Sequence, residues 1–328
     1  MSKIKVRTPA RLHVTLLDLN GELGRVDGGV GISLEEPNVI LEAESIENGM
    51  IVEGDHSGRV QEVARKIIKA YNLKNDVRIR LLKKYEEHIG LGFGTQLSLG
   101  IGFALTNLYG IHVTPRELAK VVQRGGTSGI GVAAFQDGGF IVDAGHTYGP
   151  GKQKQNFLPS SASKAPPPPV ISRLPFPEDW LIVLAIPEAS KRIHGSFEVD
   201  LFTKYCPIPI EEVQSLSHLI LMKLLPSVIE KDIVEFGKAI SLIQKVGFKR
   251  IEVELQSDEI LNLMKVIADA GTYGVGLSSF GPTIYTVIDR MKKARSIAKV
   301  AEETNMTGRI LITKGRNKGA EILNSTEA

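Results

Sequence analysis

Three glycine-rich segments divide this chain of 328 residues, and each stands next to an apolar run. They read HIGLGFGTQLSLG from residue 88, RGGTSGIG from residue 124 and GTYGVGLSSFGPT from residue 271. Glycine permits backbone conformations with positive φ and lets other backbones or ligands approach closely. We therefore expect these segments to form the tight turns around which the fold and any functional site are built.

The first glycine segment enters an apolar stretch at 97–109 that predicts a buried helix. The first N–H groups of a helix lack partners and carry partial positive charge, so a glycine loop at that point predicts an anion site, most often for phosphate. Close packing of backbones is the alternative explanation. The segment has neither the dinucleotide-binding pattern nor the G-K-[ST] of a Walker loop. The predicted binding residues are Gly90, Gly92, Gly94, Thr95 and Gln96.

A second polar cluster lies near the N-terminus, in the stretch RLHVTLLDLNGELGRVDGGVG at 11–31. So many charged groups in and around a strand favour a site over a set of surface salt bridges. Carboxylates in such a cluster can hold Mg²⁺ through oxygen, and an arginine can bind a phosphate with two parallel hydrogen bonds. The residues concerned are Arg11, His13, Asp18, Asn20, Glu22, Arg25 and Asp27, with Asp18, Glu22 and Asp27 as candidate magnesium ligands.

The other two glycine segments carry hydroxyl groups. Ser128 stands in the second segment, and Ser278 and Ser279 stand in the third, where they could bind a second anion. An ordinary tight turn is the alternative for the third segment.

Strands and helices alternate without a regular βαβ period, which favours an α+β fold. At roughly 150 residues per domain the length suggests two domains, which we place at 1–170 and 171–328. The segment 150–169 ends in four prolines and has one leucine as its only large aliphatic residue, which predicts an exposed loop or domain junction. Strands are expected at 3–16, 28–35, 38–44, 76–82, 139–143, 180–186, 284–288 and 309–313, and helices at 58–71, 97–109, 115–123, 211–223, 227–246, 257–270 and 289–304.

Composition excludes several classes of protein. A net charge of +3 gives no strong field for nucleic acid or membrane surfaces. The single cysteine, Cys206, allows no disulfide within the chain and suggests a reducing compartment. The N-terminal stretch has no signal-peptide pattern, and no apolar run reaches the ~20 residues that span a bilayer. These features predict a cytoplasmic protein with small-molecule partners.

The three glycine segments resemble those of the GHMP kinase superfamily. HIGLGFGTQLSLG is similar to its phosphate loop, RGGTSGIGVAAFQDGGF to its central segment and GLSSFGPTIY to its C-terminal glycine motif. The resemblance implies an N-terminal domain like domain 2 of ribosomal protein S5 and a ferredoxin-like C-terminal domain. Two departures argue against a kinase: Phe93-Gly94-Thr95-Gln96 replaces the usual small residues, and Gly131 stands where several of these kinases carry the proposed catalytic Asp.

The segments RLHVTLLDLNGELGRVDGGVGISLEEP, HIGLGFGTQLSLGIG and SSFGPTIY resemble one branch, the β-ribofuranosylaminobenzene 5′-phosphate synthases of archaeal methanopterin biosynthesis. This resemblance implies condensation of phosphoribosyl pyrophosphate with 4-aminobenzoate or 4-hydroxybenzoate, release of CO₂ and pyrophosphate, a requirement for Mg²⁺, and a homodimer. Within it, Asp18, Asp27 and His13 are the candidate catalytic residues, with Asp18 and Asp27 also holding the metal. Arg11 or His13 would bind the acceptor's carboxylate.

Two alternatives remain open from the sequence. One is an ATP-dependent small-molecule kinase on the same fold. The other is a ligand sensor or ribosome-associated module without turnover, against which the low net charge argues.

Overall fold

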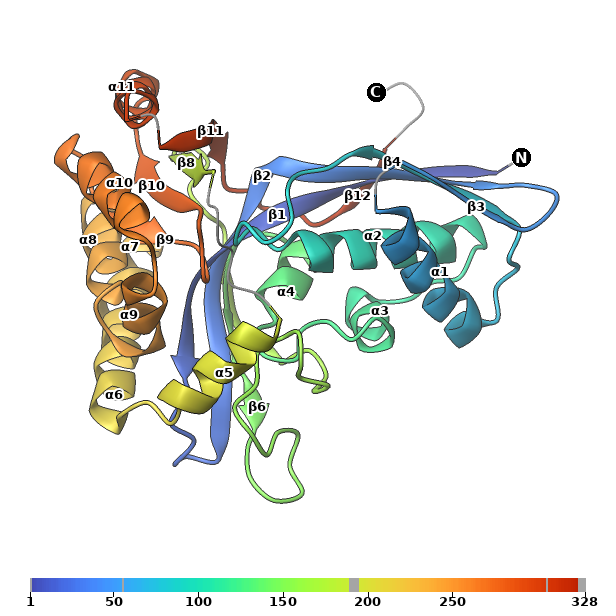
Figure 1. The fold of residues 1–328 in the computed structure, drawn as a ribbon, viewed down its shortest axis with the longest axis horizontal. Helices are drawn as coiled ribbons and strands as arrows, with labels where there is room; N and C mark the ends of the chain where they lie inside the picture. The colour runs from blue at the N-terminus through green and yellow to red at the C-terminus, as the bar shows by residue number, and fades with distance from the viewer. Residues whose placement is uncertain (1, 55, 189–194, 305, 324–328) are drawn as a thin grey trace.

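Two β-sheets and the helices packed on them make up the protein (Figure 1); all strand pairs are antiparallel except β3 with β4, which run parallel. The computed structural model describes residues 2–54, 56–188, 195–304 and 306–323. The larger sheet has eight strands and centres on the long pair β1 and β2, which run antiparallel from Lys3–Glu44 to Asp18–Asp27. Its strands are β1 (Lys3–Asp18), β2 (Arg25–Ser45), β3 (Met50–Glu53), β4 (Val77–Lys83), β5 (Phe140–Asp143), β6 (His146–Thr147), β7 (Val170–Leu174) and β12 (Glu321–Leu323).

Helices α1, α2 and α4 pack against strands of the larger sheet, on the face seen below it in Figure 1, and α3 packs on these helices. The central one, α2, lies close to the sheet because Gly100 faces it: a Cβ there would lie 3.0 Å from both Leu41 and Thr8. This explains why an apolar helix contains glycines that its intrinsic propensity disfavours. The helices are α1 (Ser57–Tyr71), α2 (Phe93–Leu108), α3 (Pro115–Val121) and α4 (Ile130–Gln136).

The smaller sheet, in the order β11-β8-β10-β9, is covered on both faces. Alternate residues of its strand β8 pack in opposite directions: Leu181 and Val183 join the cluster under α10 and α11, whereas Ile182 and Leu184 join the main core beside α8. A strand buried on both faces reads as a continuous apolar run. The strands of this sheet are β8 (Leu181–Pro187), β9 (Val275–Leu277), β10 (Ile284–Ile288) and β11 (Thr307–Lys314). The helices in this half of the chain are α5 (Ser196–Tyr205), α6 (Ile210–Leu219), the π-helix η1 (Ile220–Leu224), α7 (Leu225–Ile229), α8 (Ile233–Ile243), α9 (Gly247–Glu254), α10 (Asp258–Asp269) and α11 (Met291–Glu302).

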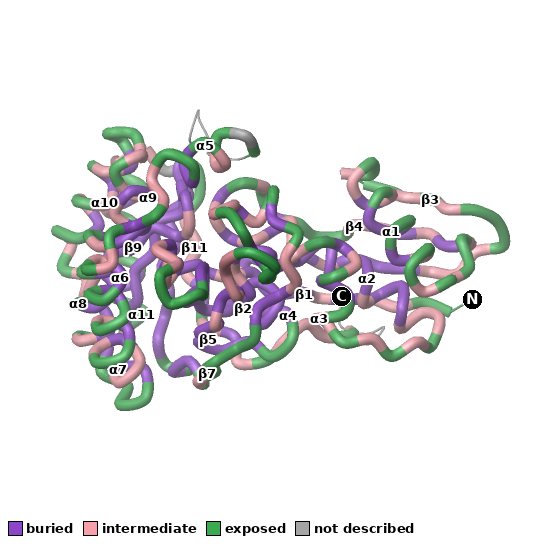
Figure 2. The backbone as a smooth tube through the Cα atoms, turned by 90° about the horizontal axis from the view of Figure 1, so that it is seen from below, coloured by how far each residue is buried: buried purple, intermediate pink, exposed green. Residues whose placement is uncertain are grey.

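The main hydrophobic core is continuous between the two sheets. It extends from Val6 and Leu12 of β1 to Trp180, Phe236 and Tyr285 on the side of the smaller sheet. Figure 2 shows the buried backbone running through this region, with exposed segments on the outer helices. No helix in the described ranges is long and apolar enough to cross a membrane.

The predicted α+β class is confirmed, but several predicted elements are wrong in detail. The strand expected to break at Pro37 continues through a cis Glu36–Pro37 bond as β2. The helix expected from 97 begins at Phe93, because Gly92 adopts φ +81° and caps it. The helix expected at 227–246 is split into α7 and α8. The predictions omitted α4, α5, α9, β3, β6, β7, β9 and β12. The division at residue 170 stays a prediction: β7 and β12 lie in the larger sheet although they follow that position.

The segment 150–169 is a loop, as its composition predicts, but it is only partly exposed. Lys154 and Ser163 are buried in it. The hydroxyl of Thr127 donates to Leu158 O at 2.6 Å, and Arg116 donates to the carbonyls of Pro167 and Pro168, both at 2.6 Å. Polar contacts with distant parts of the chain therefore hold this segment in place. Such contacts leave no local pattern in the sequence, whereas packing by aliphatic side chains would have been visible there.

Candidate functional site

The first and third glycine segments meet beside the middle of β1. Arg11 Nη1 donates to Gly90 O at 2.5 Å, and Ser278 Oγ donates to the same carbonyl at 2.7 Å. Ser278 Oγ also accepts from His13 N at 3.0 Å, and Ser279 N donates to His13 O at 3.0 Å. Gly90 is required here, because a Cβ would lie 2.2 Å from Ser278 O. The structure thus brings together five of the residues predicted from three separate segments.

These contacts explain part of the glycine pattern by packing. Ser278 is fully buried and holds the loop around Gly90, while Gly92 lies against the Arg11 side chain, where a Cβ would be 3.2 Å from Cγ. Gly94 is different: a Cβ would lie 2.4 Å from Nη2 of Arg59, a residue of α1. The first turn of α2 is therefore open on the side where a guanidinium group approaches it.

A cavity of about 200 Å³ lies over the first turn of α2, and three arginines line it. Burial lowers the pKa of Arg11 to about 10 and that of Arg124 to about 10, and the neighbouring Arg59 lowers the pKa of Arg124 further. Within the described residues, Arg124 Nε has no hydrogen-bond partner. The cavity is lined by Arg11, Arg59, Glu87, His88, Gly90, Gly92, Phe93, Gly94, Thr95, Arg124, Ser160, Ser161, Gly195, Glu198, Ser279, Phe280 and Gly281.

Three guanidinium groups beside the N-terminus of a sixteen-residue helix make a site for a polyanion. A positive cluster without enough carboxylates is costly in the absence of a ligand, and an anion would relieve the repulsion between Arg59 and Arg124. The arrangement suits an anion that several donors contact at once, such as a diphosphate.

The sequence analysis missed two of these arginines. Arg124 stands directly before Gly125-Gly126 in the second glycine segment, so its position was visible, although nothing in the sequence indicated that it turns toward the first segment. Arg59 lies on the surface of α1, and no pattern in the neighbouring sequence indicates that it belongs to a site. Its Nη1 donates to Glu87 Oε1 at 2.5 Å, which fixes the guanidinium over the cavity.

Beneath the arginines, a buried lysine supports the third glycine segment. Lys249 Nζ donates to Leu277 O at 3.2 Å and to Ser279 O at 3.3 Å, and it is ion-paired with Glu252. The nearby His13 is buried, and its Nδ1 has no partner within the described ranges. Burial first, and then Arg11 and Lys249, keep the pKa of His13 well below its usual value, so the imidazole is neutral near pH 7.

The second glycine segment packs behind the first. Gln96 Nε2 donates to Gly131 O at 2.8 Å, and a Cβ on Gly131 would lie 3.1 Å from Thr95 Cγ2. The predicted Ser128 lies near Asp143, whose Oδ2 is 3.5 Å from its hydroxyl and accepts from Gly129 N at 2.8 Å. Burial raises the pKa of Asp143 to about 7. Position 131 is a glycine and so supplies no carboxylate. Gln96 and Ser128 make contacts with other parts of the protein.

The predicted residues Asp18, Asn20, Arg25 and Asp27 lie around the β1–β2 turn, not at the cavity. At about 3.3 Å per residue, Asp18 is roughly 20 Å along β1 from Arg11. Asp18 Oδ1 accepts from Asn20 N at 2.7 Å, and Arg25 donates to the carbonyls of Ala144 and Gly145, both at 3.0 Å. The structure therefore does not bring these four residues to the cavity over α2.

Asp27 is buried in an ion cluster. Its Oδ2 lies 2.9 Å from Lys154 Nζ and 2.6 Å from His146 Nδ1, and Lys154 also donates to Oδ1 at 3.0 Å. A divalent cation at Asp27 would have to displace the ammonium group. Among the residues that the structure describes, no group of three or more His, Cys, Asp or Glu side chains is arranged to hold a metal ion.

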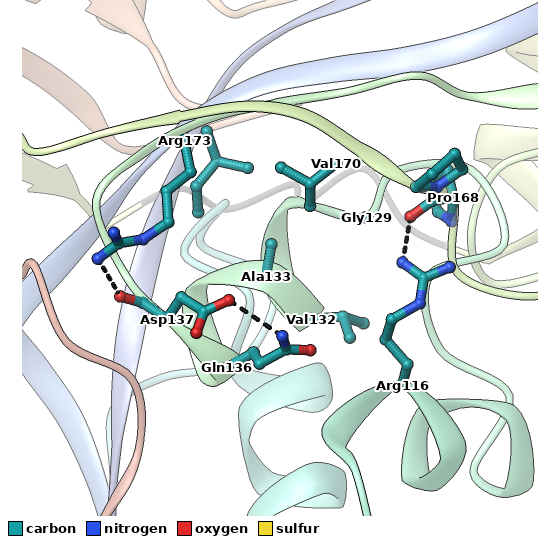
Figure 3. Close-up of a pocket in the computed structure, with 11 residues that line it drawn as sticks. Arg116, Gly129, Val132, Ala133, Gln136, Asp137, Pro168, Val170 and Arg173 are labelled. Atoms are coloured by element: carbon teal, nitrogen blue, oxygen red, sulfur yellow. Dashed lines mark hydrogen bonds between the residues drawn. The ribbon is translucent and has the colours of Figure 1, made fainter.

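A second cavity, of about 410 Å³, lies beside α4 and under Val170 (Figure 3). Its floor includes Val132 and Ala133, and an arginine stands at each end. Both arginines already serve the protein backbone: Arg116 donates to Pro167 and Pro168, and Arg173 donates to Gly138 O at 2.9 Å. We therefore assign the functional site to the smaller cavity, where the guanidinium groups crowd one another.

Comparisons with known proteins agree with this geometry. The family model described as the N-terminal domain of GHMP kinases matches residues 58–139, and the C-terminal model matches residues 224–305. The "Beta-ribofuranosylphenol 5'-phosphate synthase" of Methanothermobacter thermautotrophicus is 47% identical over 327 residues, covering 97% of this chain and 98% of that protein. The protein of the same name from Archaeoglobus fulgidus is 46% identical, with 97% and 99% covered.

Kinases resemble this chain in sequence over a shorter stretch, but kinase structures share its fold over nearly the whole chain. A homoserine kinase of Methanococcus maripaludis is 28% identical over 131 residues, covering 37% of this chain and 41% of the kinase. Among solved structures, the homoserine kinase of Cytophaga hutchinsonii has a TM-score of 0.71 at 16% identity, with 98% of each chain covered. The mevalonate kinase of L. major has a TM-score of 0.70 at 12% identity, with 97% and 100% covered. These structures share the fold alone.

Proposed function

The chain belongs to the β-ribofuranosylphenol 5′-phosphate synthases, an enzyme family with the GHMP kinase fold, and we propose that it is a phosphoribosyl-transferring glycosyltransferase. The donor is phosphoribosyl pyrophosphate and the acceptor a 4-substituted benzoate. A carbon–carbon bond forms between the ribosyl C1 and the ring carbon that bears the carboxylate, and pyrophosphate and CO₂ leave.

The observation that carries this proposal is the convergence of Arg11, Arg59 and Arg124 on the N-terminus of α2. Loss of pyrophosphate concentrates negative charge on the departing oxygens. Fixed donors placed where that charge develops lower the barrier directly.

The names of the relatives favour one of the two acceptors left open above. They specify a ribofuranosylphenol, which would arise from 4-hydroxybenzoate, whereas 4-aminobenzoate would give an aminobenzene. In both acids the para substituent donates electrons into the ring and makes the carbon opposite it nucleophilic. Loss of the carboxylate then restores aromaticity, so the reaction needs no organic cofactor.

Mg²⁺ enters the proposal as an ion that the diphosphate carries. The predicted ligand Asp27 does not fit a metal, because Lys154 and His146 occupy its oxygens, and Asp18 uses Oδ1 for the turn at Asn20. Mg²⁺ usually keeps several waters and binds through substrate phosphates with one or two carboxylates. Asp18 lies roughly 20 Å along β1 from Arg11, too far to hold an ion on a diphosphate bound by that arginine, so its predicted role as a metal ligand stays a prediction and we derive no step from the metal.

Roles for the remaining predicted residues follow from their surroundings. Arg11 is the cation available for an anionic group, since His13 is neutral. Arg25 lies at the β1–β2 turn, where it donates to the carbonyls of Ala144 and Gly145, too far along the sheet from Arg11 for one donor molecule to reach both, so its predicted role as a phosphate ligand stays a prediction. The homodimer stays part of the proposal on the resemblance alone.

The proposal is tested with purified protein, Mg²⁺, phosphoribosyl pyrophosphate and carboxyl-labelled 4-hydroxybenzoate. We expect labelled CO₂ and pyrophosphate in equal amounts. The competing kinase is favoured by the GHMP fold and opposed by Gly131, which leaves no carboxylate at the position of the proposed kinase base. Substrate-dependent ADP from ATP without labelled CO₂ would replace the proposal with a kinase.

A further inference from the structure

One carboxyl group that lines the cavity has no cationic partner among the residues that the structure describes. Two carboxylates line the cavity within the described residues, Glu87 and Glu198. Glu87 is ion-paired with Arg59 at 2.5 Å. Glu198 lies on α5 and its Oε2 accepts a hydrogen bond from the neutral hydroxyl of Ser161, at 3.1 Å. The two carboxylates thus differ in what they can do. Glu87 orients the guanidinium group of Arg59, whereas Glu198 lines the cavity and is available to accept a proton.

The charged groups around Glu198 come from several elements. Glu252 of α9 lies behind it, and the other walls of the cavity carry Arg11, Arg59, Glu87, His88 and Arg124. Burial raises the pKa of Glu198 to about 7; the Ser161 hydrogen bond opposes this shift and Glu252 adds to it. A carboxylate with a pKa near the working pH is suited to take up and return a proton.

The chemistry of the proposed reaction places the acceptor between Glu198 and the diphosphate. The attacking ring carbon approaches the ribosyl C1 on the side opposite the leaving group, which the three arginines hold. The para substituent lies at the far end of the same ring, and so points away from the arginines. Glu198 of α5 and Ser160 and Ser161 of the segment 150–169 line the same cavity as the three arginines.

We propose that Glu198 is the catalytic base that takes the proton of the acceptor's phenolic hydroxyl, and that Ser161 orients its carboxylate. This inference rests on the function proposed above. It predicts that the enzyme distinguishes its acceptors by whether they need to lose that proton.

The step balances as follows. The phenolic O–H proton moves to Glu198, and the electron pair of that bond becomes a ring ketone while the opposite ring carbon forms its bond to the ribosyl C1. The C1–O bond breaks with its electrons on pyrophosphate. The bond to the carboxylate then breaks as CO₂ leaves, its electrons restore the aromatic ring, and the phenolic oxygen recovers the proton from Glu198.

The test compares Glu198→Gln with the wild-type enzyme on two acceptors, 4-hydroxybenzoate and 3,5-difluoro-4-hydroxybenzoate, whose phenol is far more acidic. For 4-hydroxybenzoate we expect kcat/KM to fall on the order of 10²-fold, the usual size of a general-base contribution. For the acidic acceptor the fall should be much smaller, because that phenol is ionised without a base. The acid limb of the wild-type pH profile, at about pH 7, should disappear in the variant.

The matched control is Asp200→Asn, an exposed carboxylate two residues along the same helix, which should behave as the wild type with both acceptors. Calorimetric binding of pyrophosphate by Glu198→Gln, at unchanged affinity, shows that the variant is folded and that the donor side is intact. Glu198→Asp, which keeps a carboxylate, should recover part of the activity.

Two results overturn the inference: an equal loss with both acceptors, which would mean that Glu198 only positions the wall, and no loss with either. Both leave the wild-type release of CO₂ in place, and so leave the proposed function standing. If the wild-type enzyme itself releases no CO₂, the proposed function fails and this inference fails with it.

Discussion

The ammonium group of Lys154 lies 2.9 Å from Oδ2 of Asp27, and both side chains are almost completely buried. Lys154 belongs to the segment 150–169 and Asp27 to the beginning of β2. His146 binds the same carboxylate, and its Nε2 lies 2.8 Å from Pro166 O near the end of the segment. One buried carboxylate therefore holds both ends of a segment whose middle supplies Ser160 and Ser161 to the cavity.

Replacing Lys154 by Met should leave the Asp27 carboxylate buried without its ammonium partner. Breaking a buried ion pair from one side typically costs about 3–5 kcal/mol. We expect chemical denaturation to show a loss of that order, and limited proteolysis to cut within 150–169 faster than in the wild type. Lys152→Met, at an exposed position of the same segment, is the control and should change neither quantity. Wild-type resistance to proteolysis in Lys154→Met would mean that other contacts hold the segment.

Arg124→Gln should separate binding from stability. The guanidinium is partly buried beside Arg59 and has no partner for Nε in the described structure, so its removal relieves repulsion. We expect an unfolding free energy equal to or above that of the wild type. Pyrophosphate affinity should fall by about tenfold or more, because a hydrogen bond to a charged group contributes ~1.5–3 kcal/mol. The measurements are denaturant unfolding and isothermal titration, with the exposed Arg65→Gln of α1 as control. Unchanged affinity would remove Arg124 from the anion site.

Gly94→Ala should displace Arg59 without straining the backbone. Gly94 lies in the first turn of α2, where alanine is favoured over glycine, but the new methyl group would lie 2.4 Å from Arg59 Nη2. We expect unchanged or slightly higher thermal stability together with weaker pyrophosphate binding. Gly58→Ala in α1, with nothing within 4 Å of the added Cβ, is the control. If Gly94→Ala binds pyrophosphate as well as the wild type, the approach of Arg59 does not matter for the ligand.

Asp143→Asn should change how stability depends on pH. The pKa of Asp143 is raised by burial from 3.8 to about 7, so between these values the folded protein binds a proton that the unfolded chain has released. Asp143 therefore makes the wild type lose stability as pH rises from about 4 to 7, at ~1.4 kcal/mol per pKa unit. The Asn variant should lack this contribution. Denaturant unfolding at several pH values measures the difference in slope, and parallel slopes would contradict the raised pKa.

The sequence predicted the elements whose pattern is local. The strand at 180–186 is an unbroken apolar run because both of its faces are covered, and Thr114-Pro115 predicted the start of α3, where a complete capping box is present. The start of α2 was placed late, since nothing in the sequence indicates that Gly92 rather than a later residue caps the helix. The sequence likewise carried no sign that β2 continues through Pro37, so the strand was predicted to end there.

The site was predicted only in part, because its remaining members depend on contacts distant in sequence. The loop residues Gly90, Gly92 and Gly94 and the strand residue Arg11 stood in recognisable patterns. Arg59 lies on α1 like any surface arginine, and its role becomes visible only when α1 packs beside α2. Conversely, Asp27 looked like a metal ligand because its partner Lys154 lies far along the chain, in a segment that its composition described as exposed.

The short strand β12 has a consequence for how this protein is made. Its residues Glu321–Leu323 pair with Lys5–Arg7 of β1, and the buried Arg316 binds Glu35 at 2.8 Å. The larger sheet, which contains β1, therefore cannot be completed until Glu321–Leu323 have been synthesised. Pairings of such long range slow folding. During translation, the edge of β1 must wait unpaired, which makes it the place where a nascent chain is most exposed to incorrect association.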